Sequence, residues 1–380
     1  MYPRTLNLKK LITENNIMLL GPRATGKSSL VKATVKADLV INLLSHKEFA
    51  RFSSNPSLLS ELAESLEKKA TIFIDEVQKI PELLNEVHLL IEEKGLRFIL
   101  TGSSARKLKK GNANLLAGRA WSRELYPLTS KELGEHFNLI RYLNRGGLPR
   151  SYDSPDFESE LETYVGTYLK EEIQAEALTR NLPAFAKFLE VMALQSGEEL
   201  FLEGIANDTG IKAKTISNYI EILEDTLLGF TVPAFQETKK RKAISRAKFY
   251  LFDVGVSGFL GGRVVKGEKS DSFGRAMEQF VAQELRAYIS YARKRRPLQY
   301  WRSVNQQDVD FVIGRKVAIE VKASDRIGSA DLKNLKALRE ENLIEQFMII
   351  SNDEKNRKID GIELMNIHDF LRKLWNEKIF

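Results

Sequence analysis

The segment from Met18 to Leu30 constrains the fold of this chain most, because an apolar run is followed there by the spacing G-x-x-x-x-G-K-S. The residues of this loop are Gly21, Pro22, Arg23, Ala24, Thr25, Gly26, Lys27, Ser28 and Ser29. Two glycines at this spacing let successive backbone N–H groups point at one anion, next to the N-terminus of the following helix. In such a loop the lysine reaches the β- and γ-phosphates and the serine hydroxyl ligates Mg²⁺. The segment predicts a strand, a phosphate loop and a helix that bind ATP and Mg²⁺.

A second apolar run, Thr71–Asp75, ends in two adjacent carboxylates, Asp75 and Glu76. A carboxylate at the end of a buried strand beside a phosphate loop holds Mg²⁺ through water. The neighbouring carboxylate is the kind of group that deprotonates the water attacking the γ-phosphate. We therefore expect Asp75 to be a metal residue and Glu76 to be the catalytic base.

A third apolar run, Leu96–Thr101, is followed by Gly102, Ser103 and Ser104. A hydroxyl at the end of this strand is placed to sense the γ-phosphate, and Thr101 is preferred over Ser103 for this role. The alternative is a serine-rich turn after a core strand, and the spacing does not separate the two interpretations.

Composition limits the remaining classes of protein. The chain has 380 residues, which is too long for one typical core and fits two or three domains. Lysine and arginine number 58 against 51 acidic residues, and the net charge of +7 permits a polyanionic partner. Cysteine is absent and the four histidines lack ligand spacing, so neither disulfides nor a zinc site is expected. No apolar run reaches membrane-spanning length and the first residues do not resemble a signal peptide, so we expect no membrane partner and a cytoplasmic location.

Short β-runs alternate with helical patterns over residues 1–150, which predicts a parallel sheet covered by helices. The polar stretch 151–156 follows Gly146-Gly147-Leu148-Pro149 and is typical of a linker. Helical patterns then cover Leu161–Ala177 and Pro183–Ser196. We place domain boundaries so that a P-loop domain spans 1–150, a helical domain 151–265 and a C-terminal domain 266–380.

Within the helical domain, two helices flank a tight turn at Gly210, which predicts a helix-turn-helix. The runs Leu228–Pro233 and Phe249–Asp253 are expected to pair as a wing. Between them, residues 239–248 contain six basic residues in ten, a composition typical of a wing tip that contacts phosphate. The candidates for DNA binding are Lys212, Lys214, Thr215, Asn218 and Tyr219 on the second helix and Lys240, Arg241 and Lys242 in the basic run. The alternative is a solvated basic turn on a module that packs against protein.

The C-terminal domain contains two consecutive β-runs, 308–313 and 317–322, joined by Gly314-Arg315-Lys316, which predicts a hairpin. Asp310 lies on the first run, and period-two alternation places Glu320 and Lys322 on one face of the second. Two carboxylates and a lysine make up a set that cleaves phosphodiesters with Mg²⁺, and Glu278 on the preceding helix is a further candidate ligand. An inactive ion-pair network built from the same residues is the alternative.

With these blocks in this order, the chain resembles the bacterial and archaeal AAA-type ATPases that carry a C-terminal domain of unknown function. The resemblance extends over nearly the whole chain. It is carried by Gly21–Ser28, Ile72–Pro81, Leu100–Ser104, Leu116–Ala120, Tyr126–Thr129, Gly146–Pro149 and Tyr300–Lys322. It implies an α/β fold: a P-loop domain of the additional-strand class, a winged-helix middle domain and a restriction-endonuclease-like tail of the PD-(D/E)xK type. One departure is Arg150, where the resemblance implies an acidic residue.

The resemblance also suggests Arg119 as an arginine finger, which neutralises charge on the transferring phosphoryl group of a neighbouring subunit in a homo-oligomer. The alternative role for Arg119 is to anchor Glu124. Three functions are consistent with all these observations: an ATP hydrolase coupled to DNA binding or remodelling, an ATP-regulated DNA nuclease, and a nucleotide-dependent protein-assembly switch. The first is preferred.

Overall fold

The computed structural model describes residues 2–104, 116, 118–169 and 181–380. The chain divides into two compact units. The N-terminal unit consists of Arg4–Tyr126 and Ile222–Leu228. The C-terminal unit consists of Pro127–Glu221 and Gly229–Phe380, together with the residues before Arg4. Among the described residues no helix combines the length and the apolar character needed to cross a membrane.

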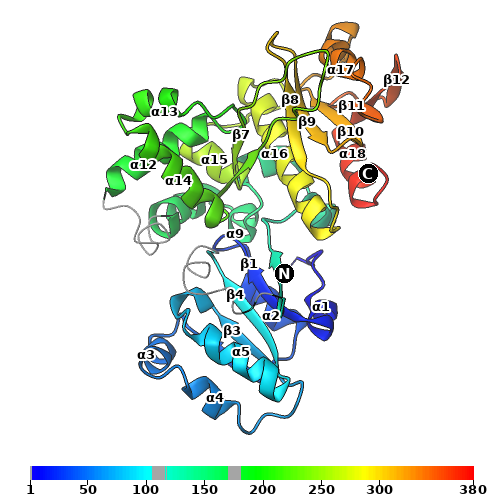
Figure 1. The fold of residues 1–380 in the computed structure, drawn as a ribbon. Helices are drawn as coiled ribbons and strands as arrows, with labels where there is room; N and C mark the ends of the chain where they lie inside the picture. The colour runs from blue at the N-terminus through cyan, green and yellow to red at the C-terminus, as the bar shows by residue number, and fades with distance from the viewer. Residues whose placement is uncertain (1, 105–115, 117, 170–180) are drawn as a thin grey trace. The chain divides into compact units, whose positions relative to one another are not determined.

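The N-terminal unit is built on a parallel five-stranded sheet, drawn in blue to cyan in Figure 1. Its strands in spatial order are β2(Leu39–Asn42), β3(Thr71–Asp75), β4(Arg97–Gly102), β1(Asn16–Leu20) and β5(Ala120–Glu124). The strands expected near residues 17, 39, 72 and 98 are confirmed, and β5 is an addition. Because β4 lies between β1 and β3, the ends of the three strands that carry the predicted site residues are neighbours.

Helices surround this sheet because each buries one apolar stripe on it. They are α1(Leu8–Glu14), α2(Lys27–Thr34), α3(His46–Ser54), α4(Leu58–Leu62), α5(Leu83–Lys94) and the short η1(Val77–Lys79). Helix α5 buries Leu83, Leu84, Val87 and Leu90 and ends at Gly95, whose φ of +63° favours glycine. The core of this unit joins β-strand residues such as Ile72 and Phe98 to these helices and to Leu227.

The first half of the C-terminal unit is helical. Its elements are α7(Ser130–Leu133), η3(Gly134–His136), α8(Leu139–Arg145), α9(Pro149–Asp153), α10(Phe157–Thr163), the π-helical η4(Tyr164–Leu169), α12(Leu182–Leu194), α13(Leu202–Thr209), α14(Ala213–Asp225) and α15(Val254–Leu260). The end of α14, from Ile222 onward, belongs to the N-terminal unit. The stretch expected to be a linker contains α9, in which Tyr152 is buried. Part of the helix expected over 161–177 lies outside the described residues, as does Ala117.

The Gly146-Gly147 pair is explained by a buried carboxylate. Asp253 Oδ2 accepts a hydrogen bond of 2.7 Å from Gly147 N, while its Oδ1 accepts from the N–H groups of Gly255 and Val256 at 3.0 Å. A Cβ on Gly146 would lie 1.9 Å from Asp253 Oδ1, so only glycine fits there. Burial raises the pKa of Asp253 to about 6 despite these three N–H donors.

The two strand pairs predicted in this unit are both present. Strand β6(Gly229–Val232) pairs antiparallel with β7(Lys248–Leu251). Strand β9(Asp308–Ile313) pairs antiparallel with β10(Val317–Val321), and Gly314 between them has a φ of +53°. The segment that connects β6 to β7 follows the edge of β8(Leu298–Arg302), where Phe235 N donates to Tyr300 O and Ile244 N donates to Arg302 O.

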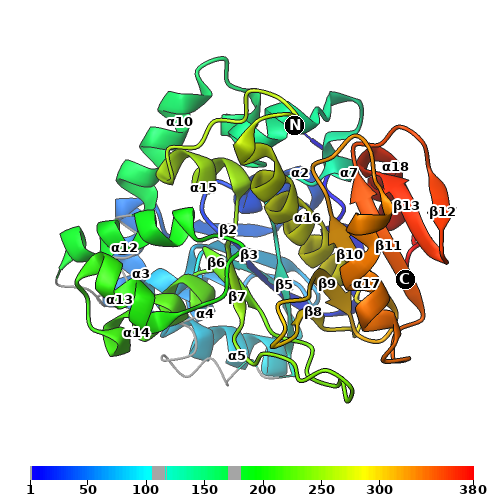
Figure 2. The same ribbon diagram turned by 90° about the horizontal axis from the view of Figure 1, so that it is seen from above.

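A mixed six-stranded sheet forms the second half of this unit, in yellow to red in Figure 2. Its spatial order is β12(Arg357–Ile359), β13(Ile362–Asn366), β11(Gln346–Ser351), β10, β9 and β8. Its helices are α16(Asp271–Tyr291), η5(Ser329–Leu332), α17(Lys333–Arg339) and α18(Ile367–Trp375). Leu335 and Leu338 of α17 share a core cluster with Val309, Ala318 and Ile349 of the strands. The predicted α/β class therefore holds for both units.

Candidate functional site

The phosphate loop connects β1 to α2, as predicted. Gly26 is the residue before the first helical turn and has a φ of +93°, a conformation that glycine adopts without strain. A Cβ on Gly21 would lie 2.4 Å from the carbonyl oxygen of Leu125, so glycine is also required where the loop leaves the strand. Ala24 between them has a φ of +62°, in the left-handed region. The loop geometry thus depends on the two glycines that define the motif.

Lys27 is 5% exposed and its side chain is directed into the loop that precedes it. Its Nζ donates to Gly21 O at 2.7 Å and to Pro22 O at 3.0 Å. The Thr25 hydroxyl donates to Pro22 O at 2.8 Å, and Arg4 donates to Thr25 O at 3.1 Å. The ammonium group is therefore held beside the backbone that is shaped to surround an anion.

Asp75 joins the second and third predicted segments to the loop. Its Oδ1 accepts hydrogen bonds from Ser28 Oγ at 2.7 Å and from the Thr101 hydroxyl. Asp75 and Thr101 end neighbouring strands, and the register that pairs Ile74 with Leu100 places them side by side. Ser28, Asp75 and Thr101 come from three separate segments of the sequence, and the fold brings all three together.

Glu76 follows directly, with a φ of +60° that is unusual for a residue with a side chain. Its backbone N–H donates to Thr101 Oγ1 at 3.2 Å. Gln78 on η1 donates its amide to Glu76 Oε2 at 2.5 Å and to Ser103 Oγ at 3.1 Å. A Cβ on Gly102 would lie 2.8 Å from Gln78 Oε1, so the glycine leaves room for this amide.

Gln78 is a residue of this candidate site that the sequence interpretation missed. Ser103, the second choice as a phosphate sensor, contacts Gln78, whereas Thr101 contacts both Asp75 and Glu76 N. The available signal was a polar residue inside the block Glu76–Ile80, where apolar neighbours predict burial. Gln78 is indeed buried, and it fixes the carboxylate of Glu76.

The donor set at this edge of the sheet fits Mg²⁺ bound with ATP. Mg²⁺ prefers oxygen ligands and is typically held by one or two protein groups plus substrate phosphates. The Ser28 hydroxyl and the Asp75 carboxylate are such oxygens, and they lie within 2.7 Å of each other beside the loop. Lys27 and the loop N–H groups supply the positive field that phosphates require.

Arg119 lies at the opposite end of the same sheet. Asn16 at the start of β1 donates its side-chain amide to Arg119 O at 2.8 Å, and Ala120 pairs with Asn16 in the register. The phosphate loop follows the other end of β1, which is about 16 Å away for five residues at about 3.3 Å each. The side chain of Arg119 pairs with Glu92 of α5 and not with Glu124. Hydrogen bonding to Arg119 lowers the pKa of Glu92.

Comparison with known protein families identifies the region around this site. Residues 13–134 match the family model described as an AAA domain. The chain carries an AAA-type P-loop ATPase domain. Residues 136–264 and 273–370 match two further models, each described as a domain of unknown function (DUF8612 and DUF4143).

Two relatives that match most of this chain are both described as uncharacterized proteins. The chain is 27% identical over 309 residues to the uncharacterized protein MJ1544 of Methanocaldococcus jannaschii, covering 73% of this chain and 68% of that protein. It is 23% identical over 341 residues to an uncharacterized protein of Haemophilus influenzae, covering 83% of this chain and 80% of that protein. Among solved structures, a single-residue variant of Thermotoga maritima RuvB matches at 17% identity and a TM-score of 0.31, covering 60% of this chain and 87% of that one. Aeropyrum pernix ORC1 in complex with DNA matches at 12% identity and a TM-score of 0.28, covering 67% of this chain and 90% of that one.

Beyond the AAA domain, the predicted recognition helix is α14, which follows the turn at Gly210. Lys212, Lys214 and Asn218 are exposed, and Thr215 is partly buried. The expectation that Tyr219 is exposed is wrong. Its ring is 5% exposed and packs against Phe185 and Phe188 of α12 at centroid distances of 4.8 and 5.3 Å, because that face of α14 covers α12.

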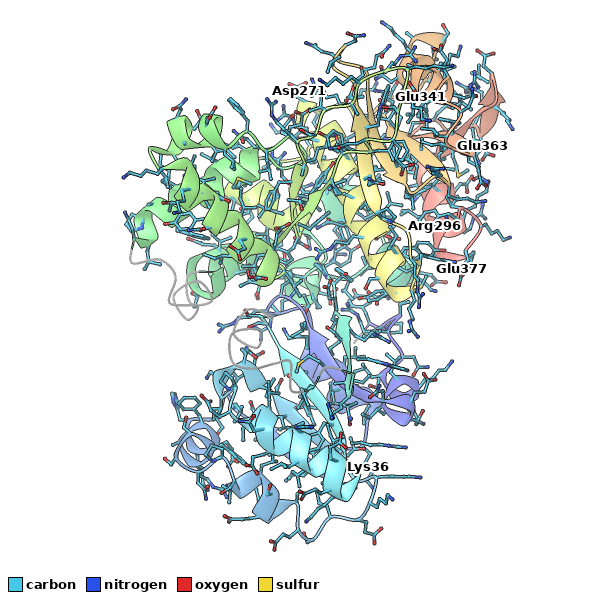
Figure 3. All side chains as sticks on the ribbon, in the orientation of Figure 1. Lys36, Asp271, Arg296, Glu341, Glu363 and Glu377 are labelled. Atoms are coloured by element: carbon cyan, nitrogen blue, oxygen red, sulfur yellow. The ribbon has the colours of Figure 1, made fainter. Side chains whose placement is uncertain are left out.

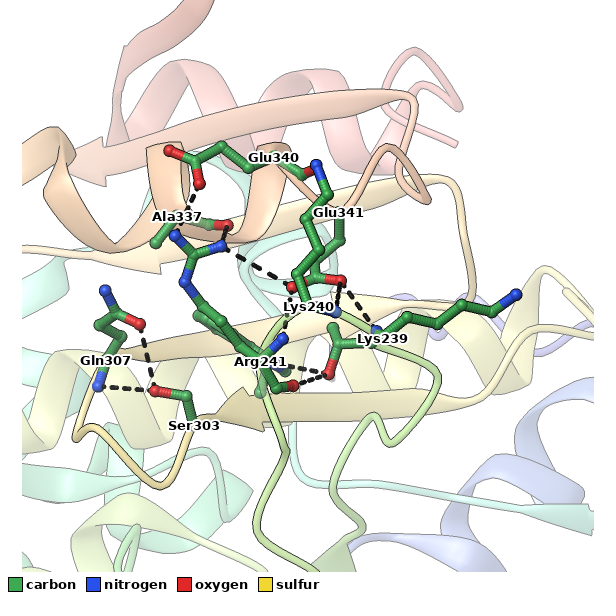
Figure 4. A network of polar contacts seen from close by, with 10 residues as sticks. Lys239, Lys240, Arg241, Ser303, Gln307, Ala337, Glu340 and Glu341 are labelled. Atoms are coloured by element: carbon green, nitrogen blue, oxygen red, sulfur yellow. Dashed lines mark hydrogen bonds and ion pairs between the residues drawn. The ribbon is translucent and has the colours of Figure 1, made fainter.

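The basic run does not project as an isolated wing tip (Figure 4). The buried carboxylate of Glu341 accepts from the backbone N–H groups of Lys239, Lys240 and Arg241 at 2.9 to 3.0 Å. Arg241 donates to Ala337 O at 3.0 Å and pairs with Glu340 at 2.6 Å. Lys240 Nζ donates to Glu340 O at 2.7 Å, and Lys242 is exposed. Glu341, which Figure 3 also labels, thus attaches this loop to the end of α17.

The four residues predicted as a nuclease-like site are buried or partly buried in the same C-terminal unit. Asp310 and Glu320 are 7% and 2% exposed. Lys322 pairs with Glu320 at 2.6 Å, and Glu278 accepts from Lys248 at 2.9 Å. Lys248, the last residue of the basic run 239–248, therefore belongs to this cluster as well.

Proposed function

We propose that this chain is a Mg²⁺-dependent ATP hydrolase of the AAA type whose turnover is coupled to DNA binding. The observation that carries the ATPase part is the contact of Asp75 Oδ1 with both Ser28 and Thr101, beside a phosphate loop that contains Lys27. A magnesium residue, a phosphate sensor and the loop are thereby joined in one hydrogen-bonded unit.

The roles of the side chains follow from their positions. Glu76, oriented by Gln78, accepts a proton from the attacking water, and Lys27 with the loop N–H groups binds the phosphates. Thr101 orients Asp75 and the backbone of Glu76. Bound Mg²⁺ supplies charge neutralisation at the β- and γ-phosphate oxygens. Arg119, at the far end of the sheet, is assigned to the nucleotide of a neighbouring copy in a homo-oligomer.

DNA is proposed as the partner because α13, the Gly210 turn and α14 precede an antiparallel strand pair, the arrangement of a winged helix. The exposed side chains of Lys212, Lys214 and Asn218 are grouped at the start of α14. The first residues of a recognition helix are those that contact a nucleic acid in this motif. The net charge of +7 has the sign that such a partner requires. Lys242 of the basic run remains a further candidate, whereas Lys240 and Arg241 are engaged by α17.

ATP hydrolysis measured with duplex, single-stranded and branched DNA tests both parts. We expect turnover that requires Mg²⁺ and rises with at least one DNA. Glu76→Gln should retain nucleotide binding and lose about 10²–10⁴-fold in rate. Glu82→Gln, an exposed carboxylate of the same unit, is the control. Absence of turnover in the unmodified protein would refute the hydrolase, and turnover without DNA binding or stimulation at low salt would refute the coupling.

The DNA surface is tested by replacing Lys212 and Lys214 with alanine together. Loss of two phosphate contacts should reduce the slope of the logarithm of affinity against the logarithm of salt concentration by about 2. Lys36→Ala, an exposed lysine of the N-terminal unit that Figure 3 labels, should leave the slope unchanged. An unchanged slope in the double variant would remove α14 from the interface.

A further inference from the structure

Lys248 is a buried cation at the centre of the carboxylates predicted to bind metal. It lies on β7, its side chain is 9% exposed, and its Nζ is 2.9 Å from Glu278 Oε1 and 3.7 Å from Asp310 Oδ1. The same ammonium lies 5.5 Å from the centroid of the Tyr300 ring. A buried lysine is stable only where carboxylates compensate its charge, and here two do so.

Three further polar groups of the cluster also have partners within the chain. Tyr250 OH donates to Glu278 Oε1 at 2.7 Å, and Val321 N donates to Asp310 Oδ2 at 2.8 Å. Lys322 Nζ pairs with Glu320 Oε1 at 2.6 Å. Each carboxylate of the predicted metal set therefore has an ammonium group of this chain within 4 Å, from Lys248 or from Lys322.

These residues do not fit a divalent cation. Mg²⁺ demands near-octahedral oxygens at about 2.0–2.1 Å, which would bring it between Glu278 and Asp310 and close to the ammonium already there. Two cations at that separation repel strongly in a buried site. Across the described part of the chain, no group of three or more histidine, cysteine, aspartate or glutamate side chains is arranged to hold a metal.

The charge states agree with this geometry. Burial by itself lowers the pKa of Lys248, but Glu278 and Asp310 outweigh it and the pKa is raised, so the ammonium persists at neutral pH. Burial and the proximity of Asp310 raise the pKa of Glu320 well above its usual range. Glu320 Oε2 has no hydrogen-bond partner, and the ammonium of Lys322 lies 2.6 Å from the other oxygen of this carboxylate.

We propose that the ammonium of Lys248 takes the place of a divalent cation between Glu278 and Asp310, while Lys322 neutralises Glu320. The cluster fastens β7 to α16 and β9 and does not cleave DNA. The tail that resembles a nuclease then serves as a rigid support for the helix-turn-helix, because β7 pairs with β6 directly after that motif. This inference concerns a site separate from the phosphate loop and stands whether or not the chain hydrolyses ATP.

Terbium titration of the full-length protein tests the proposal, since bound Tb³⁺ emits when nearby tyrosines such as Tyr250 and Tyr300 are excited. We expect the unmodified protein and Asp310→Asn to give the same emission curve. Lys248→Met should add a saturable component, and the double variant Lys248→Met, Asp310→Asn should lose it. Asp75 and the phosphate loop are common to all four proteins, so Tb³⁺ bound there contributes equally to each emission curve and cancels in the comparison.

The comparison of the unmodified protein with Asp310→Asn needs no lysine substitution, so it decides the matter even if Lys248→Met does not fold. Emission that Asp310→Asn removes from the unmodified protein would overturn the proposal. Mg²⁺- or Mn²⁺-dependent DNA cleavage that Glu320→Gln abolishes would overturn it as well. Absence of such cleavage together with identical Tb³⁺ curves supports it.

Discussion

The phosphate-loop site and the Lys248 cluster use the same kinds of side chain in opposite ways. In the first, the lysine ammonium is held by backbone carbonyl oxygens of Gly21 and Pro22, and Asp75 accepts from the hydroxyls of Ser28 and Thr101. In the second, the lysine ammonium contacts Glu278 and Asp310 directly. Hydroxyl donors leave the negative charge of a carboxylate available to a cation, whereas an ammonium neutralises it.

This difference separates a site that can exchange ligands from one that holds the fold together. The hydrogen bonds of Lys27 to Gly21 and Pro22 end on neutral carbonyl oxygens, so the lysine can turn to a phosphate without leaving a buried charge at either one. Removing Lys248 from its partners would leave carboxylates uncompensated in a buried position, which costs several kcal/mol.

Lys248→Met should lower the free energy of unfolding of the C-terminal unit by about 3–5 kcal/mol, because one partner of a buried ion pair is lost. Thermal unfolding followed by circular dichroism measures this change. The control is Lys294→Met, whose Nζ lies the same 2.9 Å from Glu377, a side chain that is 64% exposed and is labelled in Figure 3. Such a surface ion pair contributes about 0–1 kcal/mol to the free energy of unfolding. Equal effects in the two variants would mean that Lys248 is no more important than a surface lysine.

Lys27→Ala should reduce ATP turnover by about 10²–10³-fold through loss of phosphate contacts. Its melting temperature should change little, since the hydrogen bonds that the lysine gives to Gly21 and Pro22 end on neutral backbone oxygens. Activity and thermal unfolding measured on one preparation separate the two quantities. A large drop in melting temperature with retained turnover would reverse the roles assigned to Lys27 and Lys248.

Glu284 offers a third arrangement, a carboxylate buried among neutral donors. It accepts from Ser130 N at 2.7 Å, from Ser130 Oγ at 2.8 Å and from Trp375 Nε1 at 2.6 Å, and burial raises its pKa to about 7. The pKa of Glu284 is thus higher in the folded protein than in the unfolded chain, where it is near 4.5, so the protonated form stabilises the fold. This contribution to the free energy of unfolding is fully present below about pH 4.5 and is lost as the pH rises through the folded-state pKa of about 7.

Glu284→Gln should therefore flatten the dependence of stability on pH. Relative to this variant, the unmodified protein should lose about 3 kcal/mol between about pH 4.5 and about pH 7. Melting temperatures of both proteins across this range measure the difference, in which the titration of Asp253 and Asp310 cancels. If the melting temperatures of the two proteins change with pH in parallel, the pKa of Glu284 is not raised on folding and the carboxylate keeps its charge in the folded protein.

Gln78→Met should lower kcat about tenfold, equivalent to about 1.4 kcal/mol, with the KM for ATP unchanged. The thioether retains the volume of the amide but does not hold the carboxylate of Glu76. Steady-state kinetics distinguish this outcome from a packing defect, which would change the melting temperature and leave kcat largely intact.

Residues whose partners follow from strand order were predictable from the sequence. The ends of parallel strands meet at one edge, so Asp75 and Thr101 were expected near the phosphate loop, and they are. Gln78 was not foreseen because its contact with Glu76 depends on the left-handed turn at that residue. Tyr219 was misplaced because helical periodicity identifies an apolar stripe without showing how far the neighbouring helix extends across it.

Lys248 shows a different limit of sequence interpretation. Composition grouped it with the basic residues before it, but the alternation of β7 turns its side chain toward Glu278 and Asp310, which are distant in the chain. Arg241 and Lys240 of the same run likewise find their partners on α17. A run of like charges therefore reports composition only, and long-range packing decides which members face solvent.

The left-handed backbone of Glu76, the proposed catalytic base, carries a cost in stability. A residue with a Cβ in that region is about 1–2 kcal/mol less favourable than in the right-handed region, and glycine would avoid the penalty. Thr101 and Gln78 hold the strained turn in place from both sides. The AAA domain therefore retains at this turn a residue that weakens the resting fold, and a chain optimised for stability alone would have a glycine at position 76.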